Sequence, residues 1–195
     1  MNPWIGKTTF LFGLAVLIAI RAPRNRRSGK IPVIEKRSTA FDTTLLLLTA
    51  TVTGILLPFL FLLSSFLHFA DYPLLGLPFS AGILCLGFGL WLFYRSHADL
   101  GTNWSMNLEL RERHQLIVSG IYKTIRHPMY SAMFLFALAQ ALLLANWIAG
   151  PGFLVAFGLM FALRVRAEEW MMLEKFGQSY EEYRIRTKRL IPRLW

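Results

Sequence analysis

The sequence predicts an all-α integral membrane protein with about five transmembrane helices. More than half of the 195 residues are hydrophobic, yet the formal net charge is +10. The apolar residues are gathered into blocks, most of which approach the ~20 residues that a helix needs to cross a bilayer. A chain of this length is expected to form one domain, here a single membrane domain over residues 1–195.

Five apolar segments are expected to span the membrane. The first is followed by basic residues and lacks an obvious small-residue cleavage site, so we interpret it as a retained helix rather than a signal peptide. Pro58 can kink the second, which membrane helices tolerate when neighbouring groups satisfy the freed carbonyl. Turn residues at 146–152 predict a helical hairpin whose second helix extends beyond the membrane. The expected spans are 4–20, 43–67, 74–94, 130–148 and 153–163.

The placement of basic residues predicts the orientation. Segments 21–37 and 95–128 and the tail from Arg164 carry seven, five and eight of the 21 Lys and Arg residues, whereas connections 68–73 and 146–152 carry none. This alternation predicts an N-terminus outside and a C-terminus in the cytoplasm, in a cell membrane or endoplasmic reticulum membrane. Topology and anionic lipid head groups then explain the basic excess, so no nucleic-acid partner is expected.

Several function classes find no support in the sequence. A glycine-rich dinucleotide fingerprint, a phosphate loop and a nucleophile elbow are all missing. Three histidines on the expected cytoplasmic side, His97, His114 and His127, lack metal-ligand spacing, so no metal is expected. The single cysteine, Cys85, excludes an internal disulfide. Span interiors that are nearly free of charge disfavour a transporter.

The most informative segment is 120–130, which is polar, aromatic and basic and directly precedes an apolar run. A second polar cluster begins at Arg164, where the apolar hairpin ends, and the topology places both on one membrane face. Arg164 and Glu168 are four residues apart and share a helical face, so an intrahelical salt bridge is the alternative to a functional role. Glu169 points elsewhere and is expected to be solvated or paired with Arg166.

Ordered motifs run through the second half of the chain. They are His114-Gln-Leu-Ile117, Gly120-Ile-Tyr122, Arg126-His-Pro-Met-Tyr130, Arg164 with Glu168 and Glu169, Phe176-Gly-x-x-Tyr180-x-x-Tyr183, and Leu190-Ile-Pro192. In this combination the chain resembles the isoprenylcysteine carboxyl methyltransferase family and its prokaryotic relatives, within a wider group that includes phospholipid N-methyltransferases. The resemblance covers roughly residues 107–192, and the first three spans match only in character.

The resemblance implies a cytoplasmic pocket for S-adenosylmethionine, formed by the connection between the third and fourth spans and by the C-terminal helices. Segments 95–129 and 164–195 would be the catalytic parts. Glu168 would hold the cofactor and Arg164 would bind the substrate, and these two form the implied catalytic set. Arg126 would either bind the cofactor carboxylate or anchor its helix at the head groups. The implied cofactor contacts are His114, Gln115, Leu116, Ile117, Gly120, Tyr122, Arg126, His127, Pro128, Met129, Tyr130 and Glu168.

The implied reaction is methyl transfer to the carboxylate of a lipophilic, prenylcysteine-like substrate that enters from the bilayer, giving a methyl ester and S-adenosylhomocysteine. A carboxylate is ionised at neutral pH and needs no general base, whereas a phospholipid amine must first lose a proton. Arg164 therefore favours the carboxylate, although Glu168 or His127 could serve as a base for an amine. A nicotinamide-dependent reductase and a non-catalytic scaffold are further alternatives. The role of Asn107 and the oligomeric state stay open.

Overall fold

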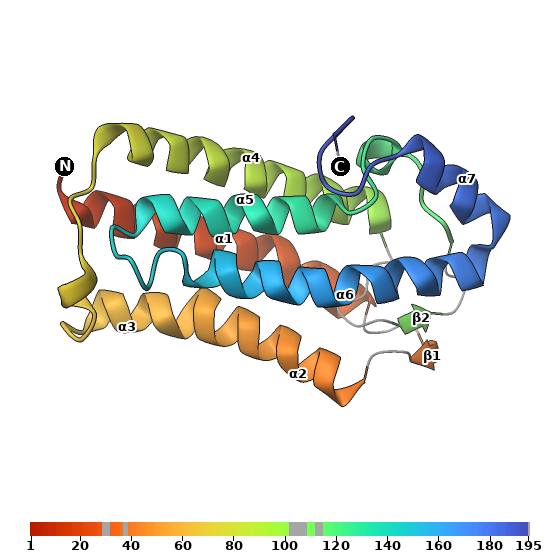
Figure 1. The fold of residues 1–195 in the computed structure, drawn as a ribbon, viewed down its shortest axis with the longest axis horizontal. Coiled ribbons are helices and arrows are strands. Elements are labelled where there is room, and N and C mark those ends of the chain that lie inside the picture. Colours follow the sequence, from red (N-terminus) through yellow and green to blue (C-terminus); the bar gives the residue numbers. More distant parts are fainter. Residues whose placement is uncertain (29–31, 37–38, 102–108, 112–114, 195) are drawn as a thin grey trace.

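The computed structural model describes residues 1–28, 32–36, 39–101, 109–111 and 115–194, which form an elongated helical bundle (Figure 1). The N-terminus lies at one end of the bundle and α7 lies at the other. The elements are α1 (Pro3–Ser28), β1 (Val33–Lys36), α2 (Ala40–Leu48), η1 (Thr49–Leu56), α3 (Leu57–Leu63), η2 (His68–Ala70), α4 (Gly76–Leu100), β2 (Glu109–Arg111), η4 (Gly120–Lys123), α5 (Pro128–Leu143), α6 (Gly152–Phe176) and α7 (Gln178–Arg186).

The prediction of an all-α membrane fold is confirmed by the lengths and composition of these helices. Three helical stretches are long and apolar enough to cross a membrane, namely Pro3–Pro23, Thr43–Leu63 and Gly76–Leu100. The fourth expected span corresponds to α5, a shorter apolar helix. The fifth forms the first half of α6, whose second half is polar, as predicted. The sequence did not predict the small antiparallel pair of β1 and β2.

The hairpin turn between α5 and α6 is organised by Asn146, which is fully buried. The Asn146 Nδ2 donates to the carbonyl of Leu67 at 2.6 Å and to Asp71 Oδ1 at 2.8 Å. Its Oδ1 accepts the backbone N–H groups of Ile148 and Ala149 at 3.0 and 2.9 Å. The Asn146 side chain thus provides hydrogen-bond partners for the backbone of the turn and connects the turn to the segment between α3 and α4.

Pro58 is accommodated by a change of helix type. Proline lacks an N–H, so the backbone before it cannot keep regular α-helical bonding. Residues Thr49–Leu56 form a π-helix, and the Leu57 N–H donates to the carbonyl of Val52, five residues back. The wider turn keeps α2, η1 and α3 in one continuous run. It also directs Thr49 and Ala50 toward the cavity described below.

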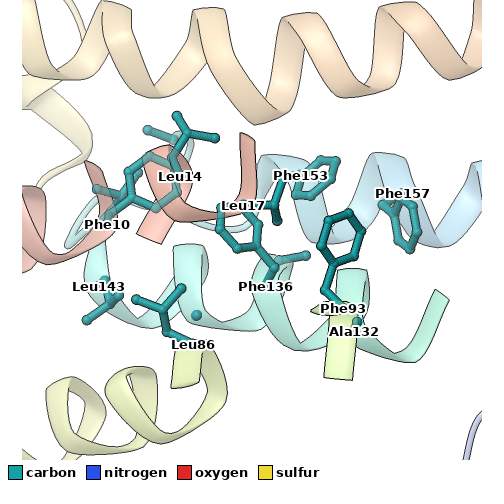
Figure 2. Packing of buried hydrophobic residues seen from close by; sticks show 14 of the residues in the cluster. Phe10, Leu14, Leu17, Leu86, Phe93, Ala132, Phe136, Leu143, Phe153 and Phe157 are labelled. Atoms are coloured by element: carbon teal, nitrogen blue, oxygen red, sulfur yellow. The ribbon is translucent and has the colours of Figure 1, made fainter. Parts of the chain in front are cut away.

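The core is built mainly from aromatic and aliphatic side chains of α1, α4, α5 and α6, with Phe61 of α3 and Leu67 added. Figure 2 shows Phe10, Leu14 and Leu17 of α1 beside Leu86 and Phe93 of α4, Ala132, Phe136 and Leu143 of α5, and Phe153 and Phe157 of α6. The sequence pair Gly87 and Gly89 suggests close helix packing. Gly89 bears this out, because a Cβ there would lie 3.1 Å from the Leu135 Cβ, whereas Gly87 has no atom within 4 Å.

Gly6 is a position in α1 where the packing leaves no room for a side chain, which gives a test of that packing. A Cβ on Gly6 would overlap the backbone carbonyl oxygen of Leu143. Gly6→Ala is therefore expected to lower the free energy of unfolding by about 1–3 kcal/mol. Gly87→Ala is the matched control and should be neutral or stabilising, because alanine is the better helix former. Thermal unfolding in detergent measures both, and equal stabilities would contradict the α1–α5 packing.

Candidate active site

A cavity of about 210 Å³ lies where α5, α6 and α7 meet η1 and residues 115–117. A single water needs only ~10–15 Å³ by this measure, so the cavity has room for an organic ligand. Among the residues that the structure describes, it gathers nearly all the predicted cofactor and substrate residues. These are Gln115, Leu116, Ile117, Tyr122, Arg126, His127, Pro128, Met129, Tyr130, Arg164 and Glu168.

Gly120 is placed differently from the other predicted contacts. Gly120 has a φ of +60°, which favours glycine, and a Cβ there would overlap the carboxylate of Asp99. Asp99 Oδ2 accepts the backbone N–H of Ile121 at 2.8 Å, so the glycine lets α4 hold the start of η4. Gly120 does not line the cavity. His114 and Asn107 lie outside the described residues.

The polar end of the cavity is centred on Glu168. The Tyr130 hydroxyl donates to Glu168 Oε2 at 2.8 Å, and His127 Nδ1 lies 3.7 Å from Glu168 Oε1. Burial raises the pKa of Glu168, but hydrogen bonding and attraction from His127, together with Arg164 and Tyr130, hold that pKa below its ordinary value. Glu168 is therefore an anion at neutral pH. Its side chain keeps 29% of its surface exposed, whereas Arg164 is buried beside it.

Glu169 corrects a sequence expectation. Instead of being solvated or paired with Arg166, it is 5% exposed and lies inside a cluster of cationic groups, while Arg166 is exposed. Its Oε2 accepts from Arg189 Nη2 at 2.7 Å, and its Oε1 accepts from Arg126 Nε at 3.1 Å. His127 Nε2 lies 3.3 Å from the same Oε1. The prediction failed because the partners of Glu169 come from distant parts of the chain, namely Arg126 and His127 before α5 and Arg189 after α7.

Arg126 and the backbone around it hold residues 184–190, termed here the C-terminal segment. The Arg126 Nη1 donates to the carbonyl of Arg184 at 2.9 Å and also to that of Thr187. The backbone N–H groups of Arg126 and His127 donate to Lys188 and Arg189 carbonyls at 2.7 and 3.0 Å. Arg126 therefore anchors the C-terminal segment beside the cavity. The sequence had suggested two other roles for it, binding the cofactor carboxylate or anchoring its helix at the lipid head groups.

Two tyrosines of α7 close the cavity from the C-terminal side. Tyr183 donates its hydroxyl to the Tyr122 carbonyl at 2.7 Å, and the rings of Tyr180 and Tyr183 lie 6.0 Å apart. Burial raises the pKa of Tyr183 to about 12, so the hydroxyl keeps its proton as a donor. The two tyrosines of the motif thus pack α7 against the rest of the protein.

The apolar wall of the cavity was not predicted. Phe153, Phe157 and Met160 line it from α6, on the same face as Arg164 and Glu168. Their spacing of four, three and four residues up to Arg164 is the period of a helix face. Extending that period back from Arg164 into the apolar half of α6 would have found these side chains from the sequence.

The charges around His127 make stability depend on pH. Burial lowers the pKa of His127, but hydrogen bonds and attraction from Glu168 and Glu169 outweigh it, so the pKa lies above its ordinary value. Burial likewise raises the pKa of Glu169, but His127 and Arg189 hold it well below the usual range. His127 therefore stabilises the fold below about pH 6.5 and loses this effect as pH rises through its raised pKa. Glu169 stabilises it above about pH 4.3 and loses this effect as pH falls.

We accordingly expect the unfolding temperature in detergent to be highest at mildly acidic pH. His127→Gln removes the group that loses its proton on the alkaline side, so the decline in unfolding temperature above about pH 6.5 should flatten. Thermal unfolding scanned over pH measures this. An unchanged alkaline decline in the variant would show that another group causes it.

Comparison with known proteins bears on this region directly. Residues 80–174 match the isoprenylcysteine carboxyl methyltransferase (ICMT) family. That stretch runs from α4 to near the end of α6 and contains every cofactor and substrate residue predicted from the sequence.

Two similar proteins are both named protein-S-isoprenylcysteine O-methyltransferase. The one from Schizosaccharomyces pombe is 33% identical over 115 residues, 57% of this chain and 47% of that protein. The one from Dictyostelium discoideum is 31% identical over 105 residues, 53% of this chain and 44% of that protein. The matched regions thus cover less than half the length of these relatives.

Among solved structures, the eukaryotic intramembrane Ras methyltransferase ICMT has a similar fold. The TM-score is 0.60, with 98% of this chain and 66% of that chain covered at 23% identity. At this identity the match shows a shared fold and no more. Together with the matched stretch of α4 to α6 and the similar sequences, it shows that this chain is similar to the isoprenylcysteine carboxyl methyltransferase family in fold and in the sequence of this region.

Proposed function

We propose that this protein transfers a methyl group from S-adenosylmethionine to the carboxylate of a lipophilic, prenylcysteine-like substrate at the cytoplasmic membrane face. One observation carries the proposal: a carboxylate and a guanidinium, Glu168 and Arg164, lie on one face of α6 at the polar end of an otherwise largely apolar cavity. The names of the similar proteins support the same reaction class.

The residues around the polar end suit S-adenosylmethionine. Glu168 is ionised and partly exposed within the cavity, so it can bind the ammonium group of the cofactor, and Tyr130 fixes its orientation. Aromatic and methionine side chains nearby offer apolar surfaces to an adenine ring. The bound cofactor would supply an electrophilic methyl group on a sulfonium.

The substrate carboxylate would meet Arg164. A guanidinium binds a carboxylate through charge-assisted hydrogen bonds. These bonds orient the attacking oxygen, and the carboxylate stays ionised because arginine does not give up its proton. Phe153, Phe157 and Met160 continue the cavity away from this point as an apolar wall that excludes water and suits a lipid chain. A carboxylate attacks in its ordinary ionised state, so these residues need only position and desolvate it.

The same geometry disfavours a phospholipid amine as acceptor. Such an acceptor needs a base to remove its proton. His127 lies between Glu168 and Glu169, whose hydrogen bonds and charges raise its pKa and so favour the protonated ring, which has no lone pair left to accept a proton. The lowered pKa of Glu168 makes that carboxylate a weak base as well.

The test uses the full chain purified in detergent or lipid. Labelled S-adenosylmethionine should bind, and a farnesylated cysteine with a blocked amine should become a base-labile methyl ester. Phosphatidylethanolamine vesicles test the amine acceptor in parallel. Absence of cofactor binding would refute the proposal and favour a reductase or scaffold. Transfer to phosphatidylethanolamine alone would identify an N-methyltransferase instead.

A further inference from the structure

We propose that a second site, at the end of the bundle opposite α7, binds the head group of a zwitterionic phospholipid. The first turns of α1 and the connection from α3 to α4 lie at that end (Figure 1), and an open pocket lies between them. Its polar lining consists of Trp4, Lys7, Ser64, Ser65, His68 and Asp71. The site is separate from the cavity of the proposed methyl transfer and does not depend on that function.

Lys7 is the residue in this pocket that indicates a ligand, because its ammonium group is buried without an anionic partner among the described residues. Its side chain is nine-tenths buried, and its ammonium lies 4.1 Å from the centre of the Phe61 ring and 5.0 Å from that of Trp4. Within the described residues it has no carboxylate partner and no hydrogen-bond acceptor. Ring faces compensate only part of the cost of withdrawing an ammonium from water. Three N–H donors facing a pocket are therefore suited to phosphate oxygens.

Asp71 narrows the choice of ligand. It lines the same pocket, is exposed, and accepts a hydrogen bond from Asn146 at 2.8 Å. No ion pair joins Asp71 to Lys7 among the residues described. A ligand that satisfies both carries a negative and a positive group, as the phosphodiester and ammonium of an ethanolamine head group do. A free phosphate dianion or an anionic head group would meet repulsion from Asp71.

The surroundings of the pocket favour a lipid as the source of this phosphate. Trp4, Phe66, Phe69 and Trp147 are exposed at this end of the bundle, with exposed fractions between 59% and 78%. Large exposed aromatics are typical of the level at which a membrane meets water. Leu63, also in the pocket wall, is 81% exposed and offers an apolar surface to an acyl chain.

A lipid bound in this way connects two parts of the fold. Its phosphate would contact α1 through Lys7, and its ammonium would contact the α3–α4 connection through Asp71. Asp71 is in turn bonded to Asn146 in the α5–α6 turn. Because binding to the folded state stabilises it, phosphatidylethanolamine should raise the unfolding temperature of the protein.

The test is native mass spectrometry of the full chain in detergent, with phosphatidylethanolamine, phosphatidylglycerol or inorganic phosphate added separately. We expect a phosphatidylethanolamine adduct that exceeds the other two and falls about tenfold in Lys7→Met. Lys7→Arg keeps the charge and should retain binding. Lys175→Met, an exposed lysine near the α7 end, is the matched control and should leave binding unchanged.

Asp71→Asn provides a second measurement should Lys7→Met fail to fold. It removes the carboxylate, so the preference for phosphatidylethanolamine over phosphatidylglycerol should shrink. The proposal is overturned if Lys7→Met and Lys175→Met bind the lipid equally. It is also overturned if wild-type protein prefers phosphatidylglycerol, or if inorganic phosphate binds as well as the lipid.

Discussion

Glu169→Ala should destabilise the end of the bundle that carries α7, with a loss of about 3–5 kcal/mol in the free energy of unfolding. The carboxylate is buried and bonded to Arg126 and Arg189, with His127 also within ion-pair distance. Removing it leaves these cationic groups close together without their shared anion. The loss should be measured by denaturation in detergent. Trypsin should also cut the variant faster in the C-terminal segment, which Arg126 and Glu169 jointly hold.

Glu182→Ala is the control for Glu169→Ala. Glu182 lies on α7 and is exposed, and its nearest cationic group, Arg186 Nη2, is 4.0 Å away. Exposed pairs of this kind contribute ~0–1 kcal/mol, so this variant should be nearly as stable as the wild type. If Glu169→Ala behaved like Glu182→Ala, the cationic cluster would not hold the C-terminal segment.

Replacing the two charged residues of the α6 face should separate cofactor binding from transfer. Glu168→Ala is expected to weaken S-adenosylmethionine binding about tenfold, because it removes the proposed partner of the cofactor ammonium. Arg164→Ala should keep most of that binding and lower transfer to a prenylcysteine analogue about 100-fold. Equilibrium binding of labelled cofactor and single-turnover ester formation measure the two effects independently.

Two further variants sharpen the comparison on α6. Tyr130→Phe removes the hydroxyl that donates to Glu168 at 2.8 Å but keeps the carboxylate, so cofactor binding should weaken only a few-fold. Arg166→Ala removes an exposed arginine two residues after Arg164 and should change neither measurement. If Glu168→Ala and Arg164→Ala both match Arg166→Ala, the two residues form a structural pair and the proposed roles are wrong.

The order and approximate bounds of the apolar helices could be predicted from the sequence because a bilayer sets the length of each span. Segments 4–20 and 74–94 were recognised from apolar length alone, and α5 and α6 from the turn residues between them. The pairing of β1 with β2 could not be anticipated, because it joins residues about 75 positions apart through backbone bonds. The π-helix before Pro58 depends on local carbonyl bonding that hydropathy does not report.

Cavity residues were predictable where they lie within one motif or one helix face. The segment 115–117 and the pair Arg164 and Glu168 are of this kind. Glu169 was misjudged because its partners come from positions 43, 42 and 20 residues away, beyond any spacing rule for a single helix. Gly120 was assigned to ligand contact, although its neighbour in the fold is Asp99 of α4.

The methionines of the cavity have a practical consequence for spectroscopy. Of the seven methionines in the chain, five line this one cavity, namely Met129, Met133, Met160, Met171 and Met172. Isotope labelling of methionine methyl groups would therefore place five of the seven methionine signals in an NMR spectrum at this cavity. Thioether side chains are flexible and adapt to the shape beside them. Their chemical shifts would follow the occupancy of the polar and apolar ends separately, without any introduced probe.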